Sequence, residues 1–180
     1  MVDDGDGLQA ARAAWTFLYY QHAATVHVLD GGLPTWESEG RALETGGSAG
    51  APESYPTPAE VEATLRVDAD WIAARLEDPG VVLVDARSSS EYGAAHIPGA
   101  VNLPWTDTKM NDSRFLSVEA LTALYEPTGA LAADTVVAYC QTGTRASVTW
   151  LTLLLAGHAD VRLYDGSWAE WSSRPELPQE

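Results

Sequence analysis

The sequence predicts an α/β protein whose parallel sheet is flanked by helices. From about residue 63 onward, short apolar runs rich in β-branched residues alternate with amphipathic stretches, a pattern typical of strands joined by crossover helices. The run Val81–Val84 is apolar throughout, as expected of a central parallel strand covered on both faces. A similar run, Val136–Tyr139, is followed at once by the chain's single cysteine, Cys140. Ligands bind beyond the carboxyl ends of strands in such sheets, so residues placed there are the candidates for chemistry.

The predicted elements form a short first part and a longer second part of the chain. In the first part we expect a helix over 8–21, a strand over 26–29 and a short helix over 33–39. A stretch rich in glycine, serine and proline follows and is typical of a linker. In the second part we expect strand 63–67, helix 69–76, strand 81–84, strand 100–103, helix 117–125, strand 136–139, helix 146–156, strand 161–164 and short helix 168–171.

Capping residues and turns indicate where several of these elements begin. Asp68 and Ser117 are N-cap types placed directly before predicted helices. Pro34 lies in the first turn of a predicted helix, where its missing N–H is tolerated. The glycines of Asp30-Gly31-Gly32 permit the positive φ that a tight turn after a strand requires.

An internal repeat indicates that the first part is an incomplete copy of the second. The order helix, strand, Asp-Gly turn and Trp-containing helix occurs twice, and Leu29–Trp36 is similar to Leu163–Trp168. We therefore predict a partial first domain over 1–45, a linker over 46–62 and a complete domain over 63–180. Two explanations are open: the first domain has lost its front, or the natural chain starts before Met1.

Composition limits the kind of protein and its partners. The chain has 180 residues and a net charge of −16, with 26 acidic residues and a single lysine, Lys109. This balance argues against nucleic-acid and anionic-membrane partners, which select basic surfaces. An acidic surface almost free of lysine favours a cytosol rich in salt, with an ordinary acidic protein as the alternative. One cysteine, no bilayer-length apolar run and an acidic N-terminus indicate a cytoplasmic protein without an internal disulfide.

Cys140 lies where a strand ends and a helix begins, and this position suits a nucleophile. A polar turn, Gln141, Thr142, Gly143 and Thr144, separates the cysteine from Arg145 and the amphipathic run after it. Backbone N–H groups at a helix N-terminus and the positive end of the helix dipole favour thiolate over thiol. Thiolate is the nucleophilic form of cysteine.

Four stretches in this order resemble the rhodanese family, whose members carry sulfur as a cysteine persulfide: Cys140–Arg145, Val82–Arg87, Glu91–Ala100 and Tyr164–Trp171. The resemblance implies that Cys140 is the catalytic residue and that the loop residues Gln141, Thr142, Gly143 and Thr144, with Arg145, surround the bound sulfur. It also implies that Arg87 holds the anionic sulfur donor. An ion pair of Arg87 with Asp85 or Glu91 is the alternative.

The function that follows is transfer of sulfane sulfur from thiosulfate to cyanide or a thiol, with no cofactor and no metal. The family's best-known thiosulfate loops carry basic residues directly after the cysteine, whereas this loop has neutral Gln141 and Thr142. For that reason 3-mercaptopyruvate is the second donor, and a persulfide carrier without turnover remains an alternative. A phosphatase loop needs five residues between cysteine and arginine, and this chain has four.

Two further expectations concern residues outside the loop. His96 has no second ligand at a suitable spacing and is interpreted as a structural histidine that hydrogen-bonds the backbone. Trp15, Leu18, Tyr19 and Trp36 belong to the partial domain, whose own sheet is not encoded. Their apolar face needs another surface, which is the second domain, a second copy of the chain or an aggregate, and we expect self-association.

Overall fold

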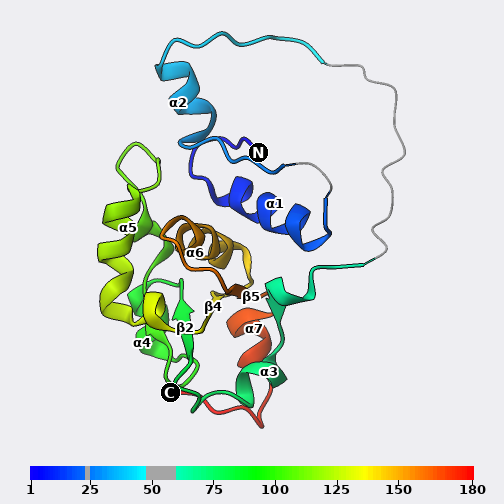
Figure 1. Ribbon diagram of the computed structural model, residues 1–180, viewed down its shortest axis with the longest axis vertical. Coiled ribbons are helices and arrows are strands. Elements are labelled where there is room, and N and C mark those ends of the chain that lie inside the picture. Colours follow the sequence, from blue (N-terminus) through cyan, green and yellow to red (C-terminus); the bar gives the residue numbers. More distant parts are fainter. Residues whose placement is uncertain (23–24, 48–59) are drawn as a thin grey trace.

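The computed structural model describes residues 1–22, 25–47 and 60–180, and a five-stranded parallel sheet forms the centre of this part of the chain (Figure 1). The strands run in the spatial order β1-β5-β4-β2-β3, and every pairing is parallel. Their bounds are β1 Arg66–Val67, β2 Val81–Asp85, β3 Val101–Asn102, β4 Thr135–Tyr139 and β5 Val161–Tyr164. The predicted fold class is confirmed.

Seven α-helices accompany the sheet in the described residues: α1 Leu8–Tyr19, α2 Gly32–Ser38, α3 Ala69–Ala73, α4 Ser89–Ala94, α5 Val118–Tyr125, α6 Thr144–Leu155 and α7 Ser167–Trp171. Short 3-10 turns lie at Ala63–Leu65, Trp105–Thr108, Glu126–Thr128 and Ala130–Ala132. Both predicted N-caps are confirmed, since Asp68 accepts a hydrogen bond from the N–H of Trp71 and Ser117 accepts one from that of Ala120.

The two faces of the sheet have separate cores. Alternate residues of β4 point to opposite sides, as the pleat requires. Val136 and Ala138 pack with α5 and α6, whereas Val137 and Tyr139 pack with α3 and α7. Cys140 continues this alternation and lies on the α6 side.

The first part of the chain packs on the outside of α6, as Figure 1 shows for α1. Trp15 is 3% exposed and joins the core on this side, and its indole Nε1 donates to the carbonyl of Leu65 at 3.3 Å. Leu18, in contrast, is 39% exposed. Of the surfaces expected to cover the apolar face of the first part, the second part of the chain therefore covers Trp15. Self-association stays a prediction.

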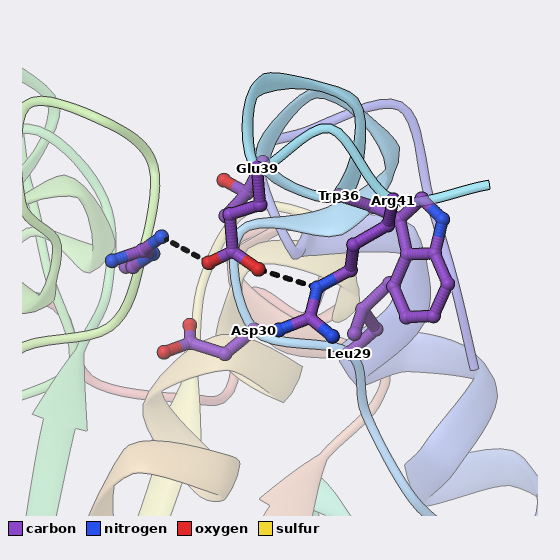
Figure 2. Close-up of a pocket in the computed structure, with 7 residues that line it drawn as sticks. Leu29, Asp30, Trp36, Glu39 and Arg41 are labelled. Atoms are coloured by element: carbon purple, nitrogen blue, oxygen red, sulfur yellow. Dashed lines mark hydrogen bonds and ion pairs between the residues drawn. The ribbon is translucent and has the colours of Figure 1, made fainter.

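A second contact between the two parts of the chain is made by residues on either side of α2. The carboxylate of Asp30 accepts a hydrogen bond from the backbone N–H of Phe115 at 2.8 Å. Glu39 pairs with Arg114 at 2.8 Å and also with Arg41, and the two arginines hold its carboxylate between them (Figure 2). A surface pocket of about 480 Å³ is lined by Leu29, Asp30, Thr35, Trp36, Glu39, Arg41 and Arg114. Three of its charged groups are paired with one another, since the carboxylate of Glu39 binds both Arg41 and Arg114.

Several predicted elements differ from those observed. Residues 26–29 lie outside every described strand: the N–H of Leu29 donates to the carbonyl of Met1, and the amino group of Met1 donates to the carbonyl of His27. Residues 63–65 form a 3-10 turn, which shortens the expected strand to Arg66–Val67, and the expected helix over 69–76 ends at Ala73. Most of the predicted linker, residues 48–59, lies outside the described residues. Within the described ranges no helix is long and apolar enough to cross a membrane.

Candidate active site

Cys140 follows the last residue of β4, and α6 begins four residues later at Thr144. Gly143 is the N-cap of α6 and has φ +86°, a left-handed conformation that glycine adopts without steric cost. The first N–H groups of any α-helix lack partners within the helix, so those of α6 face the loop. The predicted strand, cysteine, turn and helix are therefore present, and the loop lies at the carboxyl edge of the sheet.

The segment that follows β5 hydrogen-bonds the backbone of the cysteine loop. The N–H of Cys140 donates to Ser167 Oγ at 3.1 Å, and the N–H of Trp168 donates to the carbonyl of Cys140 at 2.9 Å. Ser167 adopts φ +54°, unusual for a residue with a side chain, and its hydroxyl donates to the carbonyl of Tyr164. These paired bonds explain why the strained serine persists: it satisfies the backbone of the cysteine.

Gly143 touches the same segment so closely that no larger residue fits. A Cβ on Gly143 would lie 2.6 Å from Asp165 Oδ1 and 2.7 Å from the carbonyl oxygen of Asp165. Glycine is therefore required at position 143 for two reasons: the positive φ and the close contact with Asp165. The loop is clamped between the end of β5 and the start of α6.

Arg145 interacts with the cysteine, and a carboxylate holds its guanidinium in place. Its guanidinium makes two hydrogen bonds of 2.8 Å to Glu91 on α4. The hydrogen bonds and charge of Glu91 raise the pKa of Arg145, with a smaller contribution from Cys140 beside it. In turn, the hydrogen bond from Arg145 lowers the pKa of Glu91 to about 2, so the pair is charged across the neutral range.

Arg87 lies inside the protein and not at the open rim of the sheet. Its side chain is 2% exposed and binds both carboxylate oxygens of Asp85, which is fully buried. A further N–H donates to the carbonyl of Ala95 at 2.8 Å, and the guanidinium lies 4.8 Å from the ring centre of Trp168. Burial, the largest influence, lowers the pKa of Arg87, but Asp85 raises it above its ordinary value. The ion pair with Asp85 that the sequence left open is therefore present, and it is buried.

The remaining predicted site residues gather around the same loop. Cys140 is 1% exposed, Thr142 is exposed, and Gln141 and Thr144 are half-buried. His96 Nδ1 donates a hydrogen bond to the backbone carbonyl of Tyr92 at 3.0 Å, as its structural interpretation requires. Within the described part of the chain, no group of three histidine, cysteine, aspartate or glutamate residues is arranged to hold a metal ion.

Sequence reasoning missed the role of Glu91 and the helix that carries it. Ser88 and Glu91 form a reciprocal capping box at the start of α4. The Ser-x-x-Glu spacing was a readable signal for this helix. The pairing of Glu91 with Arg145 had no such signal, because the two residues are 54 positions apart and meet only through the sheet.

A cysteine clamped between a parallel strand and a helix N-terminus, with a fixed arginine beside it, defines a class of protein built for thiolate chemistry. The family is identified by its sequence profile, that of the rhodanese-like domain, which matches residues 68–174. The chain belongs to this family.

Relatives with assigned names agree with the family. The chain is 37% identical to a probable 3-mercaptopyruvate sulfurtransferase of Pseudomonas aeruginosa, matching 99% of this chain and 66% of that protein. It is 35% identical to the sulfur carrier protein TtuD of Thermus thermophilus, over 99% and 69% of the two chains. A putative thiosulfate sulfurtransferase of Mycobacterium bovis is 36% identical, over 95% and 66%. The chain thus spans about two thirds of the length of these relatives.

Solved structures with the same fold include the anaerobic ergothioneine biosynthesis enzyme of Chlorobium limicola, bound to trimethyl histidine. The TM-score is 0.83 at 28% identity, and the match covers 96% of this chain and 45% of that enzyme. The high coverage of this chain includes its first part, so the packing of α1 on α6 also resembles that enzyme. Less than half of the larger enzyme has a counterpart here.

Proposed function

We propose that this protein is a sulfurtransferase that carries sulfane sulfur as a persulfide on Cys140. The observation that carries the proposal is the position of the cysteine, directly after β4, beneath the N-terminus of α6 and beside Arg145. Unpaired N–H groups and the helix dipole stabilise an anion there. A thiolate and a persulfide anion are both single negative charges on sulfur and suit the same environment.

The reaction proceeds in two displacements. The Cys140 thiolate attacks the outer sulfur of thiosulfate, the sulfur–sulfur bond to the sulfonate breaks, and sulfite leaves with the bonding electron pair. Cyanide or a thiolate then attacks the terminal sulfur of the persulfide, which forms thiocyanate or a new persulfide and regenerates the Cys140 thiolate. Arg145 is the fixed cation that remains beside the sulfur through both steps.

The donor is proposed to be thiosulfate, since a relative of this chain is named as a putative thiosulfate sulfurtransferase. The charges at the loop make 3-mercaptopyruvate the second candidate. Both arginines expected to attract the doubly charged donor are paired with carboxylates, Arg87 with Asp85 and Arg145 with Glu91. This pairing reduces the net positive charge at the loop, and Gln141 and Thr142 add none. A donor with one carboxylate needs less positive charge, and a relative of this chain is named as a probable 3-mercaptopyruvate sulfurtransferase.

The test is to incubate the protein with each donor separately and to measure its intact mass. A persulfide adds one sulfur atom, about 32 Da, and releases sulfite from thiosulfate or pyruvate from 3-mercaptopyruvate. We expect the adduct in the wild-type protein and none in Cys140→Ser. An adduct that persists in Cys140→Ser, or none with either donor, contradicts the proposal. Formation of thiocyanate from cyanide over many cycles separates an enzyme from a carrier.

A further inference from the structure

An arginine from the first part of the chain reaches the segment that supports the cysteine loop. Arg12 lies on α1, and its guanidinium binds Asp165 Oδ1 at 2.6 Å, with both side chains 29% exposed. The pair joins residues 153 positions apart. The Arg12 guanidinium also lies 4.8 Å from the ring centre of Trp15, which is buried, so the helix that carries Arg12 is anchored beside it.

Asp165 in turn touches the loop itself. Both its carboxylate and its backbone carbonyl lie where a side chain on Gly143 would be. Two and three residues further on, Ser167 and Trp168 bond the backbone of Cys140. The segment that begins at Asp165 therefore contacts Gly143 at one end of the loop and Cys140 at the other.

We propose that Arg12 is a positioning residue for the Cys140 loop, so that the first part of the chain completes the site. Arg12 acts in two ways. It fixes the carboxylate of Asp165 against Gly143, and it compensates a negative charge that would otherwise disfavour the Cys140 thiolate. It does not touch the reacting sulfur. The expected effect of Arg12 on sulfur transfer rests on the proposed function. Its expected effect on the reactivity of the Cys140 thiol does not.

The ion pair Glu39–Arg114 offers a matched control. It also joins the first part of the chain to the second, at 2.8 Å, with both side chains 37% exposed (Figure 2). Arg114 does not contact the Cys140 loop but lines the pocket beyond α2. Exposed ion pairs contribute little to stability. Loss of either pair should therefore affect unfolding to a similar small extent, and only loss of the Arg12 pair should affect the cysteine.

The experiment compares Arg12→Gln, Arg12→Lys and Arg114→Gln in the full chain. Iodoacetamide alkylation of Cys140 is followed by mass spectrometry across pH 5–9, a window spanning roughly the ordinary titration range of thiols. We expect Arg12→Gln to slow alkylation at neutral pH about three- to tenfold and to move its pH profile upward. Arg12→Lys should restore much of the rate, because it keeps the charge beside Asp165. Arg114→Gln should match the wild-type protein.

Two outcomes overturn the inference: Arg12→Gln and Arg114→Gln behaving alike in alkylation, or Arg12→Lys behaving like Arg12→Gln with unfolding unchanged in both. A parallel measurement of sulfur uptake from thiosulfate tests the proposed function separately. If the wild-type protein takes up no sulfur while Arg12→Gln still alters alkylation, the proposed function fails and the positioning role of Arg12 stands.

Discussion

Substitution of Gly143 by alanine tests whether the fit of the loop against Asp165 controls the reactivity of Cys140. Gly143 has φ +86°, and an alanine Cβ would lie 2.6 Å and 2.7 Å from two oxygens of Asp165. The left-handed conformation costs an alanine about 1–2 kcal/mol. The second oxygen belongs to the backbone and cannot rotate away, so the loop has to move, at a further cost of about 1–3 kcal/mol.

Gly129→Ala separates these two costs. Gly129 has φ +76°, but no atom lies within 4 Å of the position of its Cβ. Its substitution thus carries the conformational strain and the loss of unfolded-state entropy common to any glycine-to-alanine change, without the contact. The difference in free energy of unfolding between the two variants, measured in urea, reports the contact with Asp165 alone.

The consequence for chemistry is expected to exceed the consequence for stability. A displacement of about 1 Å at a reacting group can cost on the order of a hundredfold in rate. We expect Gly143→Ala to slow sulfur uptake from thiosulfate by about ten- to a hundredfold, whereas Gly129→Ala leaves the rate unchanged. If both variants lose the same stability and both take up sulfur at the wild-type rate, the clamp on the loop does not position the cysteine.

Three further substitutions test the charges and the packing. Arg87→Ala should cost about 3–5 kcal/mol of unfolding free energy in urea, because it leaves the buried Asp85 carboxylate unpaired. Glu91→Gln should lose stability by a constant amount above pH 4.5, and the loss should vanish as the pH falls toward 2, because Arg145 lowers the pKa of Glu91 to about 2 in the folded state. Trp15→Ala should cost about 3–5 kcal/mol, since its side chain is buried against α6.

A control variant or a contradicting result is defined for each of these three substitutions. Arg174 pairs with Asp70, whose side chain is 76% exposed, so Arg174→Ala should leave the free energy of unfolding nearly unchanged. If Arg87→Ala changes the free energy of unfolding as little as Arg174→Ala does, Arg87 behaves as a surface residue. A stability difference for Glu91→Gln that persists unchanged to pH 2 would contradict the pairing with Arg145. Trp36→Ala removes a half-buried ring and should cost clearly less than Trp15→Ala.

The sequence contained enough local information for the fold class and for the position of the cysteine. Apolar runs of four or five residues and the helical spacing after Arg145 depend only on neighbouring residues, and β4 and α6 were found where that pattern placed them. The first part of the chain was harder. Residues 26–29 have the composition of a strand, but a strand exists only when another strand pairs with it, and pairing is not local.

The partners of the charged residues were decided by the tertiary structure. Arg87 and Asp85 are close in sequence, and their pairing was a readable alternative, but burial of both was not, because it depends on Trp168 and Tyr139 from other elements. Glu91 meets Arg145, and Arg12 meets Asp165, only because the sheet order brings α4, α6, α1 and the end of β5 to one edge. Sequence by itself determined which residues have chemistry to offer, since reactivity belongs to the side chain and its local turn. Which charges compensate one another was left to the fold, since electrostatic interaction depends on distance in space and on burial.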